Sequence, residues 1–227
     1  MKLTQKSFGF RTAVFILKPI FCFWYNPQVI SKYNIPKSGP VVIACNHKHI
    51  MDQCMVIINT HRPINYMAKA EYFKGFKAFF FKMTGCICVN RNGNDEQAKK
   101  EALTVLKNGG ALGIFPEGTR NKTDCLLMDF KFGAASLACK SEAKVLPVAV
   151  TGDYKFRSKN LTARIGEPFS VEGMSVAEVN YELKERIANL IKENLKAGYG
   201  TEDEYIRAER YFQEKITVNN SDFLKED

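Results

Sequence analysis

The feature that most constrains the fold is an alternation of short β-rich runs with helical patterns, which begins at residue 39. Strands that alternate with helices are typical of α/β folds, in which helices cover a sheet that contains parallel strand pairs. We expect strands at residues 41–45, 65–68, 86–90, 111–115, 145–150 and 161–165. We expect helices at residues 53–59, 72–83, 94–108, 132–139 and 175–197. The sequence therefore predicts an α/β fold, with a mostly parallel mixed sheet flanked by helices.

The length of 227 residues suits one domain with terminal extensions. An apolar content of 45% with 25% charged residues is ordinary for a soluble fold, and argues against both wholesale disorder and a polytopic membrane protein. We expect an N-terminal amphipathic helical segment at residues 1–34, a main domain at residues 35–198 and a charged extension at residues 199–227. The extension has a pattern that suits one amphipathic helix.

Residues 8–25 form an apolar and aromatic segment that also carries Arg11 and Lys18. Lys18 and Pro19 interrupt it, and leave apolar runs shorter than the ~20 residues that a membrane-spanning helix requires. It also lacks the cleavage site of an export signal. We therefore expect this segment to lie in a membrane interface, with a helix packed on the core of the domain as the alternative.

The balance of charges indicates an anionic partner, because the chain has 33 Lys and Arg residues and 24 acidic residues, which gives a net charge of +9. Such a surplus attracts anionic lipid headgroups or other polyanions, and the charge alone does not choose between them. The seven cysteines are an odd number without repeated CxxC spacing. This usage predicts reduced thiols in the cytoplasm, with small buried side chains and no metal site.

The first polar cluster with a chemical use is NHKHIMD, which follows the predicted strand 41–45 directly. Ligands of open α/β sheets bind at the carboxyl ends of the strands, where His47 would stand. Residues five apart in a straight helix are rotated by about 140°, so a turn must precede the helix if Asp52 is to reach His47. Asp52 would then hold one imidazole nitrogen and leave the other free to accept a proton from an alcohol. A structural His-Asp pair is the alternative reading of this motif alone.

Two further polar turns follow predicted strands. Arg91 ends the run GCICVNR, and the planar fork of an arginine suits phosphate oxygens. In the run FPEGTR, Gly118 allows the backbone to approach a ligand, and Thr119 with Arg120 suits an oxyanion. Each motif alone is also compatible with a solvated strand end or, for Glu117 and Arg120, with a surface ion pair.

Taken in order, NHKHIMD, GCICVNR, FPEGTR and the hydrophobic strand around Pro147 resemble the glycerolipid acyltransferases, most closely the 1-acyl-glycerol-3-phosphate (lysophosphatidic acid) acyltransferase or PlsC family. The resemblance covers about residues 36–169 and includes the segment MAKAE around Lys69. A single motif is weak evidence, whereas four in the family's order are strong evidence. Pro147 also predicts a sheet edge or a specially shaped strand end.

The resemblance implies a catalytic pair, a set of acceptor-binding residues and a reaction. His47 and Asp52 would be catalytic. The residues that would bind a phosphorylated acceptor are Lys69, Arg91, Glu117, Gly118, Thr119 and Arg120. A fatty acyl group would pass from a thioester donor, acyl-CoA or acyl-carrier protein, to lysophosphatidic acid and give phosphatidic acid. No cofactor or metal ion is implied, and the protein would be peripheral on the cytoplasmic face of the cell membrane, in contact with anionic lipid and not with nucleic acid.

In this reaction His47 would remove the proton of the acceptor hydroxyl as its oxygen attacks the thioester carbonyl. Cys45 or Cys54 offers a covalent alternative with His47, although neighbouring residues on a strand point to opposite faces. Two other hypotheses stay open. The acceptor could be a different lysolipid, or the chain could be a non-catalytic basic protein that coats anionic membranes or nucleic acid.

Overall fold

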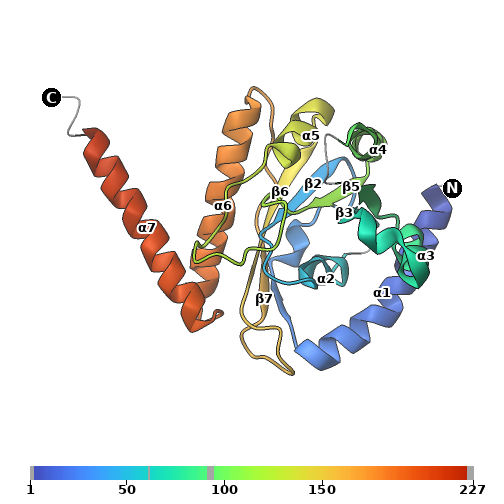
Figure 1. The fold of residues 1–227 in the computed structure, drawn as a ribbon, viewed down its shortest axis with the longest axis horizontal. Coiled ribbons are helices and arrows are strands. Elements are labelled where there is room, and N and C mark those ends of the chain that lie inside the picture. Colours follow the sequence, from blue (N-terminus) through green and yellow to red (C-terminus); the bar gives the residue numbers. More distant parts are fainter. Residues whose placement is uncertain (1–2, 61, 91–94, 224–227) are drawn as a thin grey trace.

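A central sheet lies between two layers of helices in the computed structural model, which describes residues 3–60, 62–90 and 95–223 (Figure 1). The strands are β1 (Gln28–Ile30), β2 (Val41–Cys45), β3 (Ile64–Lys69), β4 (Ile87–Val89), β5 (Ala111–Ile114), β6 (Lys144–Thr151) and β7 (Thr162–Ile165). Their order is β1-β7-β6-β2-β5-β3-β4, and only the β6–β7 pair is antiparallel. The predicted fold class, a mostly parallel mixed sheet flanked by helices, is confirmed.

The helices are α1 (Leu3–Tyr25), α2 (Asp52–Ile57), α3 (Gly75–Met83), α4 (Glu96–Lys107), α5 (Gly133–Ser141), α6 (Val176–Lys196) and α7 (Glu202–Phe223), with 3-10 turns at Lys32–Asn34 and Ala70–Phe73. Each predicted strand and helix is present, with bounds that differ by a few residues. The short strand β1 was not predicted. With three half-buried residues it is too short to show an alternating pattern, and it forms only through parallel pairing with β7.

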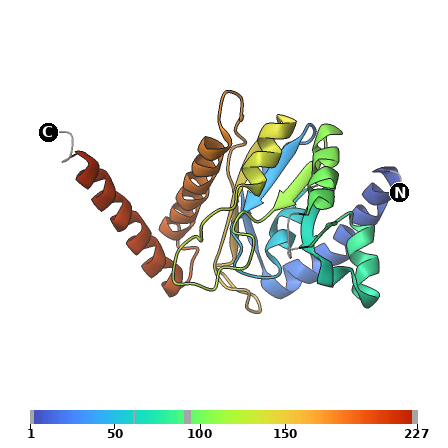
Figure 2. The same ribbon diagram turned by 45° about the horizontal axis from the view of Figure 1, so that its top comes forward.

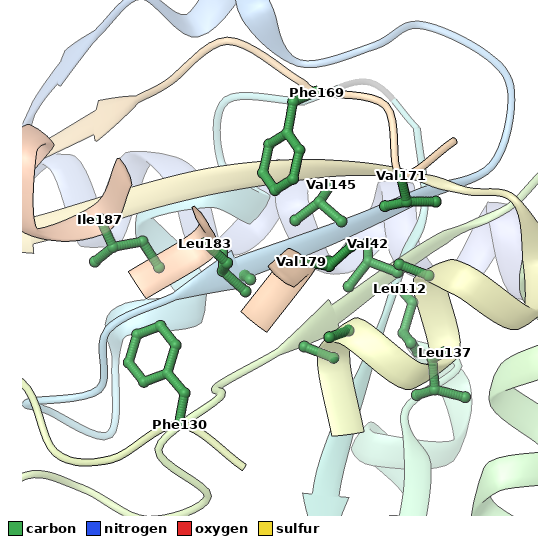
Figure 3. Close-up of a cluster of buried hydrophobic side chains, with 14 of the residues drawn as sticks. Val42, Leu112, Phe130, Leu137, Val145, Phe169, Val171, Val179, Leu183 and Ile187 are labelled. Carbon is green, nitrogen blue, oxygen red and sulfur yellow. The ribbon is translucent and has the colours of Figure 1, made fainter. Parts of the chain in front are cut away.

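Alternate residues of the strands face the two helical layers. Val42 and Ala44 of β2 point toward α4, α5 and α6, whereas Val41, Ile43 and Cys45 point toward α1 and α2. The α6 side forms the larger apolar cluster, part of which is shown in Figure 3. The residues labelled there are Val42, Leu112, Phe130, Leu137, Val145, Phe169, Val171, Val179, Leu183 and Ile187. Both faces of the sheet are therefore buried, which explains the continuous apolar runs of its central strands.

Pro147 does not mark an edge strand, because β6 lies between β7 and β2. Its carbonyl accepts a hydrogen bond from the backbone N–H of Gly166 at 2.9 Å, just beyond the last residue of β7. The N and C=O of one strand residue point to the same side. The missing N–H of Pro147 therefore faces the end of β7, where the ladder stops, and a proline is tolerated in an internal strand.

Helix α1 runs through Pro19 without interruption, so Lys18 and Pro19 interrupt the apolar run of the sequence and not the helix. Its window Phe8–Tyr25 is long and apolar enough to cross a membrane by length and composition. One face of the helix, which includes Phe10 and Phe21, is buried against the domain.

Helix α7 extends away from the sheet, and two views show its far end standing clear of the other elements (Figures 1 and 2). Its first turn is tied to the domain by Glu204. This carboxylate accepts hydrogen bonds from the backbone N–H groups of Gly152 at 2.9 Å and Thr201 at 2.8 Å, and it pairs with the side chain of Lys48. The division at residues 34 and 198 stays a prediction.

Candidate active site

The parallel pairing of the central strands brings two of the sequence motifs together. Ala44 of β2 pairs with Ile114 of β5, so the loops that follow these strands leave the sheet at the same edge. The side chain of Asn46 extends the pairing of β2 with β6, because its amide donates to the carbonyl of Val150 at 2.9 Å and accepts from the Val150 N–H at 2.7 Å. These two bonds fix the point at which the chain enters the turn that carries His47.

His47 and Asp52 are in direct contact. Nδ1 of His47 lies 2.9 Å from Oδ2 of Asp52, and helix α2 begins at Asp52 after a turn, as the spacing of the two residues requires. The ring of His47 stacks on Phe115 with a centroid distance of 3.8 Å and an interplanar angle of 13°. The carboxylate and the phenyl ring together orient the imidazole, and Nε2 is the nitrogen left for a substrate.

Asp52 is fully buried and its carboxylate accepts four hydrogen bonds. Besides His47, Oδ2 accepts from the backbone N–H groups of Lys48 at 2.7 Å and His49 at 2.8 Å. Oδ1 accepts from the hydroxyl of Tyr154 at 2.7 Å. Burial, followed by the charge of Asp52, raises the pKa of Tyr154 well above its ordinary value, so this hydroxyl stays a donor. Because buried polar groups need hydrogen-bond partners, these four donors hold the Asp52 carboxylate in one orientation, with Oδ2 toward His47.

Glu117 supports the same turn from the loop after β5. It is buried, and its two oxygens accept from the backbone N–H groups of His47 at 2.7 Å and Met128 at 2.9 Å. Burial raises the pKa of Glu117 to about 7, although the two backbone bonds act in the opposite direction. The backbone N–H of Asn121, the residue after FPEGTR, donates to the carbonyl of His47 at 2.6 Å. The loop after β5 therefore binds both the N–H and the C=O of His47.

A cavity of about 610 Å³ opens beside His47. Its polar part is lined by Lys69, Thr119, Arg120 and Lys122. The rest is mainly apolar, with walls from α1, α2, α3 and β3 that include Phe10, Ala13, Val14, Leu17, Met51, Ile57, Ile64, Tyr66, Met67 and Phe81. The site thus joins an imidazole, a cationic region and a long apolar space, which suits an acceptor or donor with a charged head and an apolar chain.

The remaining residues singled out in the sequence lie in different places. Arg91 is outside the described residues. Gly118 lines a second cavity, of about 760 Å³, on the α4 and α5 side of the sheet, and it has a φ of 72°, which favours glycine. Burial raises the pKa of Cys45, and raises that of Cys54 to about 12. Both sulfurs are therefore protonated near neutral pH, which disfavours the covalent alternative.

Three contributors to the site had no assigned role in the sequence. Tyr154 contacts Asp52 from 102 positions away, Phe115 stacks on His47, and Lys122 lines the cavity. Phe115 belongs to FPEGTR, so the motif contained a signal for it, whereas nothing near Tyr154 resembles a catalytic motif. Among residues 3–60, 62–90 and 95–223, no group of three or more His, Cys, Asp and Glu side chains is placed to hold a metal ion.

A family model described as Acyltransferase matches residues 26–151, which is more than half of the chain and includes the His47–Asp52 pair and the FPEGTR loop. The chain belongs to the acyltransferase family.

Several relatives within the acyltransferase family have a more specific name. The 1-acyl-sn-glycerol-3-phosphate acyltransferase of Bacillus subtilis (strain 168) is 32% identical over 158 residues, which cover 67% of this chain and 78% of that protein. The protein of the same name from Borreliella burgdorferi is 30% identical over 174 residues, which cover 74% of this chain and 69% of that protein. The crystal structure of the 1-acyl-sn-glycerophosphate (LPA) acyltransferase PlsC from Thermotoga maritima matches with a TM-score of 0.65 at 25% identity, covering 86% of this chain and 80% of that chain. The resemblance to this group of glycerolipid acyltransferases is confirmed.

Proposed function

We propose that this acyltransferase moves a fatty acyl group from a thioester donor to the free hydroxyl of lysophosphatidic acid and forms phosphatidic acid. The observation that carries the proposal is the contact of His47 with the buried Asp52, at the junction of a cationic and an apolar part of one cavity. The names of the two bacterial relatives and of the Thermotoga structure support the choice of acceptor.

In the proposed mechanism Asp52 accepts from Nδ1–H of His47, so Nε2 carries the lone pair. Nε2 removes the proton of the acceptor hydroxyl while the hydroxyl oxygen attacks the thioester carbonyl. The imidazolium that results is stabilised by the Asp52 carboxylate. As the tetrahedral intermediate collapses, the C–S bond breaks and the imidazolium returns the proton to the leaving thiolate. The reaction is a direct transfer without an acyl-enzyme.

The cavity suggests how the substrates are placed. We assign the phosphate of the acceptor to the cationic part, where Lys69, Arg120 and Lys122 are within one cavity with His47. Charge-assisted bonds from such groups are stronger than neutral ones. We assign the apolar part, beneath α1, to an acyl chain, whose length would be limited by the depth of this space. Either acyl-CoA or acyl-carrier protein would serve as the donor.

The test of the reaction is an acyl-transfer assay with purified protein, lysophosphatidic acid and each donor in turn, with the product identified by its mass. We expect phosphatidic acid from the wild type and a loss of about 10²-fold or more with His47→Ala, because a general base contributes this much. Turnover by His47→Ala close to that of the wild type would refute the mechanism. A wild type that binds membranes but transfers no acyl group would favour the non-catalytic alternative.

We further propose that the protein lies on the cytoplasmic face of the membrane, with α1 in the plane of the interface. The face of α1 opposite to Phe10 and Phe21 is exposed and apolar. Its large exposed residues are Phe8, Phe15, Ile16, Ile20, Phe23 and Trp24. A helix that crossed the bilayer would have to give up the contacts of its buried face, whereas a helix in the interface keeps them. Sedimentation with vesicles should show weaker binding for Phe15→Ser with Ile20→Ser, and equal binding would contradict the orientation.

A further inference from the structure

The loop between β6 and β7, at residues 153–160, carries an exposed aromatic residue among cations. Phe156 is 56% exposed, and its neighbours Lys155 and Arg157, together with Lys159, are exposed as well. Lys155 pairs with Asp153 at 2.9 Å, whereas Arg157 and Lys159 form no ion pair with a carboxylate in the described part of the chain. The tip of this loop therefore presents one apolar ring and two unpaired positive charges to the surroundings.

This tip is joined to the end of helix α1. The ring of Phe156 lies edge-on to Trp24 at a centroid distance of 5.2 Å and to Phe23 at 6.2 Å. The backbone N–H of Arg157 donates to the carbonyl of Trp24 at 2.6 Å. The last carbonyl groups of a helix have no partner within the helix, and this bond satisfies one of them. The loop tip and the exposed face of α1 form one continuous surface, apolar in its middle and basic at its margin.

We propose that residues 153–160 form a second membrane-binding element, in which Phe156 enters the acyl boundary of the bilayer and Arg157 and Lys159 bind the phosphates of anionic lipids. The proposal rests on the proposed function, since an enzyme with an insoluble acceptor must work at a lipid surface. Charge complementarity and continuity with α1 select an anionic membrane as the partner. Aromatic residues flanked by cations suit the interface between headgroups and acyl chains.

The same loop reaches the catalytic pair. Two residues before Phe156, Tyr154 donates to Oδ1 of Asp52 at 2.7 Å and stacks on His49 with a centroid distance of 4.1 Å. Tyr154 also contacts Tyr25 of α1 edge-on at 5.5 Å. The residue proposed to enter the membrane, Phe156, is thus two positions from Tyr154, the residue that holds Asp52. A membrane bound by this loop would therefore bring the lipid that supplies the acceptor near the catalytic pair.

The test is the binding of the full-length protein to vesicles, followed through the single tryptophan, Trp24, which contacts Phe156 directly. Vesicles of phosphatidylcholine, with or without about a third of phosphatidylglycerol, contain brominated lipids that quench an inserted tryptophan. Arg157→Gln with Lys159→Gln should weaken binding to the anionic vesicles by roughly ten- to thirtyfold, since each cation contributes about fivefold, and should leave binding to neutral vesicles unchanged. Phe156→Ser should weaken binding to both by about fivefold or more.

A matched control is Lys107→Gln with Lys144→Gln, which removes the same charge at the opposite end of the strands, because Lys107 ends the helix before β5 and Lys144 is the first residue of β6. We expect its binding to stay within about twofold of the wild type. Loop variants that bind as the wild type does, or a control that loses as much as they do, would overturn the proposal. A change of oligomeric state in Phe156→Ser without a change in vesicle binding would also overturn it, in favour of a second copy of this chain.

Acyl transfer to lysophosphatidic acid dispersed in detergent separates this proposal from the proposed function. The loop variants should retain wild-type turnover in detergent, because Phe156, Arg157 and Lys159 line no part of the cavity beside His47. If the wild type is inactive in detergent and on vesicles, the proposed function fails, whatever the vesicle binding shows. If all forms are active and bind vesicles equally, the loop proposal alone fails.

Discussion

Replacement of Asp52 by asparagine tests whether its negative charge, and not only its shape, serves the reaction. In the wild type Oδ2 accepts three hydrogen bonds, from His47, Lys48 and His49, and Oδ1 accepts one from Tyr154. An asparagine can place its oxygen at the Oδ2 position and keep those three bonds. Its NH₂ group then faces the hydroxyl of Tyr154, which can rotate to accept. The opposite orientation would direct NH₂ against three donors, so the first is strongly favoured.

The expected magnitude follows from this geometry. His47 keeps its tautomer in Asp52→Asn, but the imidazolium of the transition state loses its counter-charge. Two unit charges about 4 Å apart interact by ~4 kcal/mol at an effective dielectric constant of about 20. A loss of this size corresponds to about a thousandfold in kcat. The protein should remain folded, because its hydrogen bonds persist in weaker form at a cost of about 1 to 3 kcal/mol.

The assay measures kcat and the KM for lysophosphatidic acid. Thermal unfolding is measured on the same preparations. A suitable control is Asp203→Asn, the same change at an exposed carboxylate of α7, and its kcat should stay within about twofold of the wild type, since an exposed ion pair contributes little. If Asp52→Asn retained a kcat within about tenfold of the wild type, with an unchanged melting temperature, the counter-charge would have no catalytic role and the pair would be structural.

Three further predictions concern other residues that the site or the sequence motifs single out. Tyr154→Phe should lower kcat about tenfold with KM unchanged, because the carboxylate loses one of its four donors; an effect on KM alone would contradict this. Glu117 has a raised pKa of about 7, so its protonation stabilises the folded wild type at low pH and this contribution is lost as pH rises from about 4.5 through 7. In denaturant titrations the unfolding free energy of the wild type relative to Glu117→Gln should therefore fall by about 3 kcal/mol between pH 4 and pH 8, and a constant difference would refute the assignment. Arg91→Ala and Arg120→Ala should each raise the KM for the acceptor about ten- to a hundredfold with little change for the donor, and unchanged acceptor kinetics in both would return them to a surface role.

The succession of strands and helices along the chain, and which of their residues are buried, follow from patterns that are local in the sequence. The apolar run of β2 and the helical period of α6 predict a buried strand and an amphipathic helix without knowledge of their neighbours. The contact between His47 and Asp52 could also be predicted from local sequence. Their spacing already required a turn before the helix, and the geometry of a turn depends on a few adjacent residues.

Only the tertiary structure decided how distant segments meet. Parallel pairing of β2 with β5 placed Glu117 beneath the backbone of His47, so its carboxylate supports the turn and does not line the cavity. Expected as an acceptor-binding residue, Glu117 is therefore proposed to position His47.

Tyr154 and Phe156 illustrate why contacts between distant segments could not be predicted from the sequence. Both follow β6, and they contact Asp52 and Trp24 only because β6 lies beside β2 and the loop folds back on α1. Likewise, a proline is tolerated in the internal strand β6 because β7 ends opposite Pro147, and the sequence around Pro147 does not reveal where β7 ends. Such contacts depend on strand order and register, which are set by the packing of the whole chain, whereas hydrophobic periodicity records only which face of each element is buried.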